Sequence, residues 1–143
     1  MRDRCRLRGA DNGNLSCRYG HQVTLLDIDR ERIERLQAGN LPIFEPGLGE
    51  LLARNRATGR IAATTSYEQA VTDADFVFIA VATPAAVEGG EADLSFVQAA
   101  ATELGRYLPP GRRTIVINKS TVPIGTGDWI ASILAAHAPL TAE

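Results

Sequence analysis

Polar residues with the potential to bind a ligand stand at the ends of three short apolar stretches. They are Asp27 after the first stretch, Thr83 and Pro84 after the second, and Ser120 and Thr121 after the third. Hydroxyl groups donate and accept hydrogen bonds and carboxylates accept them, so the set suits a polar small molecule. If the stretches are parallel strands of one sheet, their carboxyl ends share the edge where such sheets bind ligands. Thr and Pro also end strands for purely structural reasons, and that alternative stays open.

Asp27 points to one ligand chemistry in particular. An acidic residue at the end of the second strand of a dinucleotide-binding unit accepts hydrogen bonds from the adenosine ribose hydroxyls and repels a 2′-phosphate, which favours NAD over NADP. Arg32 lies one helical turn further on and could reach the same end of a cofactor, and Lys119 could face it from the third stretch. The alternatives are a turn or capping role for Asp27 and solvated side chains for both cations.

The composition is that of a one-domain globular chain. Its 143 residues are 45% hydrophobic and 22% charged, enough to bury a sizeable core, and its net charge of -2 gives no general attraction to nucleic acid or anionic membranes. The longest wholly apolar run, 76–82, is far shorter than the roughly 20 residues of a membrane helix. We therefore expect a cytoplasmic protein with a small-molecule partner and no nucleic-acid or membrane partner.

The sequence offers no convincing metal site or hydrolytic triad. Cys5 and Cys17 form no Cys-x-x-Cys pair, and His21 and His137 are the only histidines. Neither histidine has a Ser or Cys nucleophile at matched spacing. We expect no bound metal.

Strand and helix patterns alternate along the chain from residue 21. Apolar stretches predict strands at 23–26, 61–64, 76–82 and 114–117. Helix starts are marked by Asp29, Ser66 and Asp93, helix ends by Gly39, Gly59 and Pro109, and apolar faces by residues such as Leu48, Val97 and Ile130. Connections of this length require parallel pairing with right-handed crossovers. The expected fold class is α/β, with a doubly wound parallel, Rossmann-like sheet.

Five blocks of sequence, in the same order, resemble the UDP-glucose/GDP-mannose dehydrogenase family, and within it most closely the UDP-glucose 6-dehydrogenases. The blocks are GHQVTLLDID (20–29), LPIFEPGL (41–48), AVATP (80–84), EADLSFV (91–97) and NKSTVPIGTG (118–127). The resemblance implies that residues 20–143 form part of a Rossmann-like NAD-binding domain of a nucleotide-sugar dehydrogenase.

The resemblance also implies a role for each matching residue. Those implied to bind or border NAD are Asp27 and Arg32 at the adenosine end, then Val81, Thr83, Pro84 and Ser120. Thr121 matches the family threonine beside the nicotinamide and the catalytic water, which makes it the catalytic candidate. In the family, NAD oxidises the C6 alcohol of a nucleotide sugar twice, to a carboxylate, through a cysteine thiohemiacetal and thioester.

The implied substrate is UDP-glucose, and the complete enzyme is implied to be a homo-oligomer. One alternative keeps the enzyme class with GDP-mannose or a UDP-N-acetylhexosamine as substrate. The other is a non-catalytic binding module that associates through its exposed strands. Because the family's cysteine nucleophile and sugar-binding domain lie beyond residue 143, we expect this chain alone to be inactive.

Residues 1–19 depart from the family pattern. They contain five arginines and no apolar periodicity, so we expect an aberrant or disordered segment from a shifted reading frame or a mistaken start. Counting back from Gly20, the three glycines of the family's Gly-x-Gly-Tyr-Val-Gly turn fall at Arg4, Arg6 and Gly9. Too few residues precede Arg4 for a first strand, so we expect an incomplete sheet without its central strand and of marginal stability.

Overall fold

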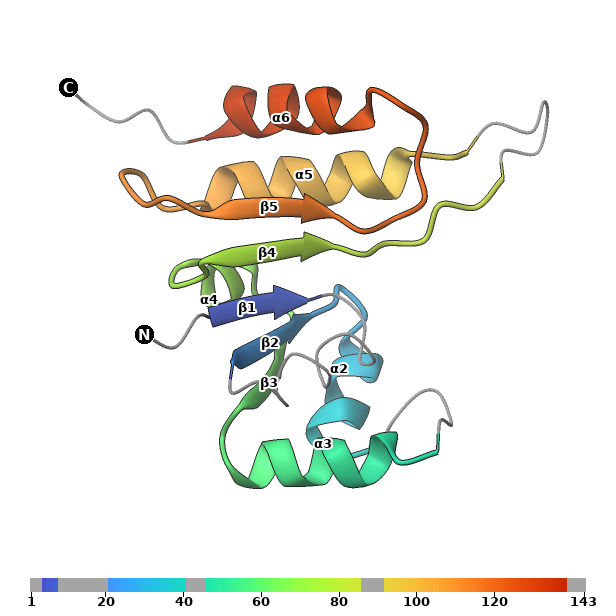
Figure 1. The fold of residues 1–143 in the computed structure, drawn as a ribbon, viewed down its shortest axis with the longest axis vertical. Coiled ribbons are helices and arrows are strands. Elements are labelled where there is room, and N and C mark those ends of the chain that lie inside the picture. The colour runs from blue at the N-terminus through green and yellow to red at the C-terminus, as the bar shows by residue number, and fades with distance from the viewer. Residues whose placement is uncertain (1–3, 8–20, 41–45, 86–91, 139–143) are drawn as a thin grey trace.

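A parallel sheet of five strands forms the centre of the computed structural model, which describes residues 4–7, 21–40, 46–85 and 92–138, with the backbone alone for 4–7. The strand order is β3-β2-β1-β4-β5 (Figure 1). The strands are β1 (Arg4–Leu7), β2 (Gln22–Leu26), β3 (Ile61–Thr64), β4 (Phe76–Ile79) and β5 (Ile115–Asn118). This is the order of the first five strands of the six-stranded Rossmann sheet. The predicted class, a doubly wound and incomplete Rossmann-like sheet, is confirmed.

The central strand β1 corrects the expectation that this strand is missing. Cys5 pairs with Val23 of β2 on one side and with Phe76 of β4 on the other. Strands β2 and β4 each present backbone N–H and C=O groups toward the space between them. A segment of only four residues forms a strand there because its backbone pairs with both neighbours. The letters RCRL alternate charged and apolar residues over only four positions, which is too short a pattern to predict a strand.

The position of β1 also changes the interpretation of the glycine count. Arg4 and Arg6, which the count from Gly20 assigns to turn glycines, lie within a strand. Residues 8–20, with Gly9, lie outside the described residues, and so do most of the segment predicted to be disordered and parts of the blocks at 41–48 and 91–97. The expectation of disorder for 1–19 is therefore wrong at 4–7, and for the rest of that segment it stays a prediction.

Five helices in the described residues connect or follow the strands. They are α2 (Arg30–Gln37), α3 (Leu48–Ala57), α4 (Tyr67–Val71), α5 (Ser95–Tyr107) and α6 (Thr126–His137). Asp29 begins α2 by accepting a hydrogen bond from the Arg32 N–H at 3.1 Å, and Gly39, with a φ of 90°, ends it. Ser66 caps α4 by accepting from the Gln69 N–H at 3.3 Å. These caps confirm the predicted starts of α2 and α4 and the predicted end of α2. For α5 the N-cap is Leu94 and not the predicted Asp93.

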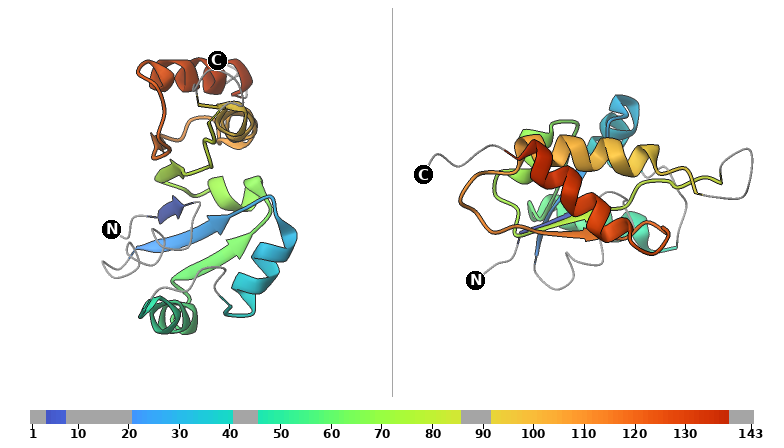
Figure 2. Two further views of the ribbon diagram at one scale, coloured as in Figure 1. Left: turned by 90° about the vertical axis from the view of Figure 1, so that its right-hand side faces the viewer. Right: turned by 90° about the horizontal axis from the view of Figure 1, so that it is seen from above.

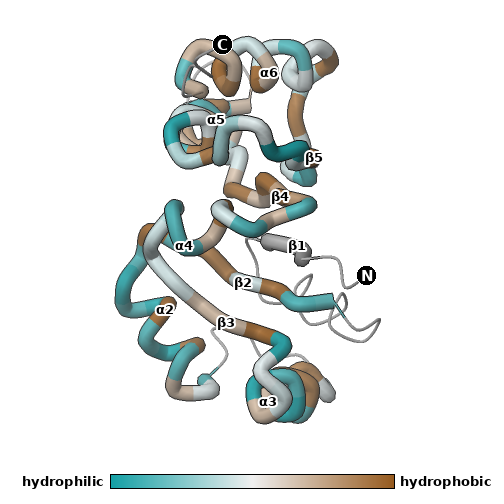
Figure 3. The backbone as a smooth tube through the Cα atoms, turned by 90° about the vertical axis from the view of Figure 1, so that its left-hand side faces the viewer, coloured by the Kyte–Doolittle hydropathy of each residue, from teal (hydrophilic) through white to brown (hydrophobic). Residues whose placement is uncertain are grey.

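The sheet separates two hydrophobic clusters. Val77 and Ile79 of β4 pack into one cluster with side chains of α4, α5 and α6, whereas Phe76 and Phe78 pack against a second cluster with side chains of α2 and α3. Alternation of this kind is required of a strand that is covered on both faces. Figure 2 shows α6 lying across α5, and Figure 3 shows that β4 is hydrophobic whereas α2 is largely hydrophilic.

Within the described residues, none of the helices has both the length and the apolar character that crossing a membrane requires.

Candidate cofactor-binding site

Asp27 lies directly after β2 and is nearly buried, with 9% of its surface exposed. Its N–H donates to the Thr64 carbonyl at 3.3 Å, which continues the pairing of β2 with β3 by one residue. Its Oδ1 accepts from the Asp29 N–H at 3.1 Å, and its Oδ2 accepts from Arg32 Nη1 at 2.8 Å. Asp27 thus stabilises the turn into α2, while Asp29 is the residue that caps the helix. Asp27 therefore has the role in the turn that the sequence left as an alternative. Its side chain also lies at the C-terminal end of β2, where a cofactor would bind.

Arg32 connects the first turn of α2 to the Asp27 carboxylate. Its side chain is half exposed, and its Nη2 lies 4.0 Å from Asp29 Oδ2. The hydrogen bond to Asp27 and the negative charge of that residue raise the pKa of Arg32. Arg32 is therefore an ion-paired side chain at the sheet edge, and the alternative of a merely solvated cation does not hold.

Ser120 joins the ends of β4 and β5 through one side chain. Its hydroxyl donates to the Val81 carbonyl at 2.8 Å and accepts from the Val81 N–H at 3.0 Å. The last backbone bond between the strands runs from the Lys119 N–H to the Ile79 carbonyl at 2.8 Å. This explains why β4 ends at Ile79 and not at Ala82 as predicted: beyond Ile79 a side chain, and not a strand, satisfies the backbone.

Thr83 and Thr121 form a second contact between the same two turns. The Thr83 hydroxyl donates to the Thr121 carbonyl at 3.0 Å. The Thr121 side chain is exposed, and its hydroxyl makes no hydrogen bond to any other residue that the structure describes. Pro84 is exposed, and its carbonyl accepts from the Asp93 N–H at 2.8 Å. The predicted site residues after β4 and β5 are thus brought together as one connected unit.

The carboxyl ends of β2, β4 and β5 lie at the same edge of the sheet, as the parallel pairing requires (Figure 1). Asp27 stands at one end of this edge, and the unit of Val81, Thr83, Ser120 and Thr121 stands at the other. Because three strand spacings separate β2 from β5, the edge between them is about 14 Å long. The structure therefore gathers every predicted site residue along one rim.

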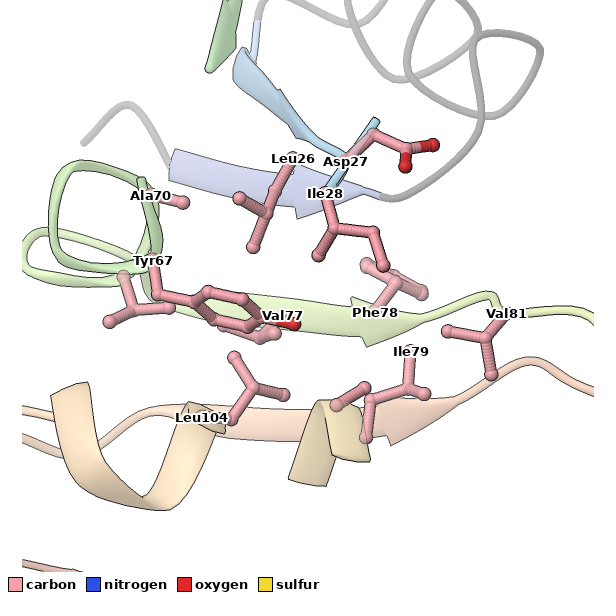
Figure 4. Close-up of a pocket in the computed structure, with 12 residues that line it drawn as sticks. Leu26, Asp27, Ile28, Tyr67, Ala70, Val77, Phe78, Ile79, Val81 and Leu104 are labelled. Atoms are coloured by element: carbon pink, nitrogen blue, oxygen red, sulfur yellow. The ribbon is translucent and has the colours of Figure 1, made fainter. Parts of the chain in front are cut away.

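A pocket opens beside the rim on the face covered by α4 and α5. Its cavity volume is only about 30 Å³, so it is a shallow apolar depression at the rim. The residues that line it are mostly apolar: Leu26, Asp27, Ile28, Tyr67, Ala70, Val71, Val77, Phe78, Ile79, Val81, Ala100 and Leu104. In Figure 4, Ile28 and Val81 flank the end of the pocket nearest the rim, while the Asp27 carboxylate points away from it. This shape offers an apolar wall beside a polar acceptor.

Two residues of the site escaped the sequence interpretation. Ile28 is 66% exposed at the pocket, and only its position after Asp27 could have indicated it. Asn118 accepts from the Ser120 N–H at 3.3 Å and donates to the Ser120 carbonyl at 3.4 Å. An Asn two residues before a turn residue is a known turn signal, and it was available in the sequence. Among the described residues, no group of three potential ligands could hold a metal ion.

The relatives of this chain are nucleotide-sugar dehydrogenases. UDP-glucose 6-dehydrogenase YwqF of Bacillus subtilis (strain 168) is 44% identical over 118 residues, which are 82% of this chain and 26% of that protein. The UDP-glucose 6-dehydrogenase of Rhizobium meliloti (strain 1021) is 46% identical over 121 residues, or 85% of this chain and 27% of that protein. The chain thus spans about a quarter of the length of these curated relatives.

Solved structures agree with the sequence relatives. A UDP-glucose dehydrogenase from the archaeon Pyrobaculum islandicum superposes with a TM-score of 0.89 at 40% identity, over 96% of this chain and 33% of that one. A family model described as the NAD binding domain of the UDP-glucose/GDP-mannose dehydrogenase family matches residues 9–142. The chain therefore belongs to the UDP-glucose/GDP-mannose dehydrogenase family, and the matched residues are its NAD binding domain.

Proposed function

We propose that this chain is the NAD-binding part of a UDP-glucose 6-dehydrogenase, the enzyme that oxidises UDP-glucose to UDP-glucuronate. The observation that carries the proposal is the rim: the Asp27 carboxylate stands at one end and the exposed Thr121 side chain at the other, with three strand spacings, or about 14 Å of sheet edge, between strands β2 and β5. Two nucleosides joined by a pyrophosphate have the length to engage both ends, whereas a mononucleotide engages one.

The described residues fit such a cofactor. Asp27 would accept hydrogen bonds from the adenosine ribose, with Arg32 holding its carboxylate in place, and the exposed apolar side chain of Ile28 would lie against the adenine ring. Val81, Thr83 and Pro84 would border the cofactor between its ends. When bound, NAD supplies the hydride acceptor.

Thr121 would act at the nicotinamide end as the catalytic candidate. Its hydroxyl is exposed while its carbonyl is held by Thr83, so the residue is fixed in place with its side chain available. A threonine hydroxyl can orient a water molecule or a substrate oxygen by donating or accepting a hydrogen bond. Ser120 would support this turn by holding Val81.

Binding of NAD to the purified chain tests the proposal. Isothermal titration calorimetry should detect saturable binding of NAD, and Asp27→Ala should weaken it at least tenfold because a charge-assisted hydrogen bond is lost. Glu34→Ala is the matched control, since Glu34 is an exposed carboxylate further along α2. Binding that is absent in the wild type, or unchanged by Asp27→Ala, would contradict the proposal.

The identity of the sugar is a finer part of the same proposal. Four UDP-glucose 6-dehydrogenases are 39 to 46% identical to this chain, whereas the GDP-mannose 6-dehydrogenase of Pseudomonas aeruginosa is 37% identical. An enzyme that contains this domain should therefore reduce NAD faster with UDP-glucose than with GDP-mannose. The reverse preference, measured at equal concentrations, would contradict it.

Assembly and location complete the proposal. We propose a cytoplasmic enzyme that forms homo-oligomers when complete, which cell fractionation and light scattering of the complete protein would test.

A further inference from the structure

The two peptide groups on either side of Thr121 are each held by a side chain. The Ser120 carbonyl belongs to the peptide group before Thr121, and Asn118 Nδ2 donates to it at 3.4 Å. The Thr121 carbonyl belongs to the peptide group after Thr121, and the Thr83 hydroxyl donates to it at 3.0 Å. Because a peptide group is planar, holding both groups restricts both backbone dihedral angles of Thr121. The exposed Thr121 side chain therefore projects from a backbone that its neighbours hold in place.

The half-buried side chain of Asn118 binds Ser120 on both of its backbone groups. Asn118 Oδ1 accepts from the Ser120 N–H at 3.3 Å, while Nδ2 donates to the Ser120 carbonyl. An amide side chain can do this because it carries a donor and an acceptor, whereas an ionised carboxylate only accepts. Both bonds are long, so each is weak on its own. They act together with the two bonds between Ser120 and Val81, which hold the same residue to the turn after β4.

We propose that Asn118 is a positioning residue: it acts through the peptide group before Thr121 to hold the Thr121 hydroxyl where the nicotinamide end of the cofactor binds. The inference rests on the proposed function for the position of that end. A hydroxyl that is fixed before binding loses less conformational freedom on binding, so it contributes more to affinity than a mobile one. The alternative is that Asn118 only ends β5 with a turn, which is a common use of Asn.

The ratio of the affinities for NAD and 5′-AMP distinguishes the two roles, because 5′-AMP has only the adenosine end of the cofactor. Calorimetry on the whole chain would measure both. Asn118→Ala should lower the affinity for NAD relative to 5′-AMP by about threefold to tenfold, the scale of one or two weak hydrogen bonds. A residue that only ends β5 would change the stability of the protein but not this ratio. Asn40→Ala is the matched control, since Asn40 is an exposed residue after α2, and it should leave the ratio unchanged.

A double-mutant cycle with Thr121→Val shows whether Asn118 acts through the Thr121 hydroxyl. Valine keeps the branched shape of threonine and removes the hydroxyl, so it should lower the affinity for NAD relative to 5′-AMP by itself. In the Thr121→Val background, Asn118→Ala should lower the ratio no further, because there is no hydroxyl left to position. An equal fall in both backgrounds would overturn the inference, and so would an unchanged ratio in folded Asn118→Ala.

NMR on the wild type provides a second measurement that does not depend on the folding of any variant. Saturation with NAD should shift the signals of the Asn118 side-chain amide and of the Thr121 N–H, whereas 5′-AMP should leave both in place. If neither signal responds to NAD, the inference is wrong.

Failure of the proposed function gives a different pattern. If NAD binds the wild type and Asp27→Ala weakens it, but the ratio does not move in Asn118→Ala, the proposed function stands and only the inference fails. If NAD does not bind the wild type, both fail.

Discussion

At the scale of single residues, Ser120 uses its hydroxyl within the protein. The O–H donates to the Val81 carbonyl and the oxygen accepts from the Val81 N–H, so both backbone groups of Val81 are satisfied by one side chain. Asn118 holds Ser120 in turn through its backbone. The resemblance to the family implies that Ser120 lines the cofactor pocket. We propose that it does so by keeping the turns after β4 and β5 together, with Thr121 as the group whose hydroxyl stays available.

Ser120→Ala should lower the free energy of unfolding. It should also weaken NAD binding, because the side chain that holds the turns after β4 and β5 together is removed. Two hydrogen bonds are lost and the partly buried backbone groups of Val81 lose their partner, which should reduce the free energy of unfolding by about 2 kcal/mol. Urea unfolding followed by circular dichroism measures this. Ser132→Ala is the control, since Ser132 is exposed and makes one local bond to the Trp129 carbonyl in α6. Equal midpoints for Ser120→Ala and the control would contradict the role of Ser120.

The stability of the segment before α5 should depend on pH because of Asp93. The Ser95 N–H donates to Asp93 Oδ1 at 2.9 Å, and the backbone and hydroxyl of Ser95 together lower the pKa of Asp93 from its ordinary 3.8. Because the folded pKa is depressed, this contribution to stability is fully present above pH 3.8 and is lost as the pH falls through the lower folded value. Carboxyl ¹³C NMR should give a midpoint below 3.8, and the Ser95 amide signal should follow the same titration. In Asp93→Asn that titration of the amide should disappear; a midpoint at or above 3.8 in the wild type would argue against the hydrogen bond.

At the scale of elements, α5 and α6 approach closely at a glycine. A Cβ atom at Gly105 would lie 2.9 Å from His137 Cβ and 3.1 Å from the Leu134 carbonyl oxygen. The backbone of α6 cannot yield as the end of a flexible side chain can, so a methyl group here would push the two helices apart. The site depends on this packing, because α6 begins shortly after Thr121 and α5 lines the pocket.

Gly105→Ala should therefore destabilise the protein by about 1 to 3 kcal/mol, the usual cost of overpacking. Gly49→Ala is a matched control on α3, where an added Cβ meets nothing within 4 Å. There the change should stabilise by about 0.5 to 1 kcal/mol, because alanine favours a helix. Thermal unfolding by calorimetry would measure both. The opposite signs are the test, and a Gly105→Ala protein as stable as the wild type would rule out the close contact.

The elements also show what could be read from the sequence and what could not. The strands and helices from residue 22 onward follow from apolar periodicity and from caps such as Asp29 and Ser66, which act over a few residues. Parallel pairing then predicts that Asp27 and Thr121 share an edge. The strand β1 could not be predicted, because backbone groups of β2 and β4 define it. The partners of Arg32 and Ser120 depend on how side chains meet in three dimensions, which the sequence pattern does not specify.

At the scale of the whole molecule, β1 connects the two halves of the site. The adenosine end of the rim belongs to β2, and the Thr121 end belongs to β4 and β5, so the hydrogen bonds of β1 to both neighbours fix the distance between them. A four-residue strand is short, and each ladder bond contributes modestly. The central position of β1 offsets its short length, because its backbone makes hydrogen bonds to β2 on one side and to β4 on the other.

Removal of residues 1–7 should therefore damage folding and binding together. Without β1 the edges of β2 and β4 would be exposed, so we expect loss of the cooperative thermal transition, association that increases with protein concentration, and loss of NAD binding. Removal of residues 1–3 is the control, because it leaves the residues of β1 in place, and it should preserve all three properties. Differential scanning calorimetry and light scattering over a range of concentrations would compare the two. If the chain without residues 1–7 unfolded as cooperatively as the control and remained monomeric, β1 would not be the strand that holds the two ends of the rim together.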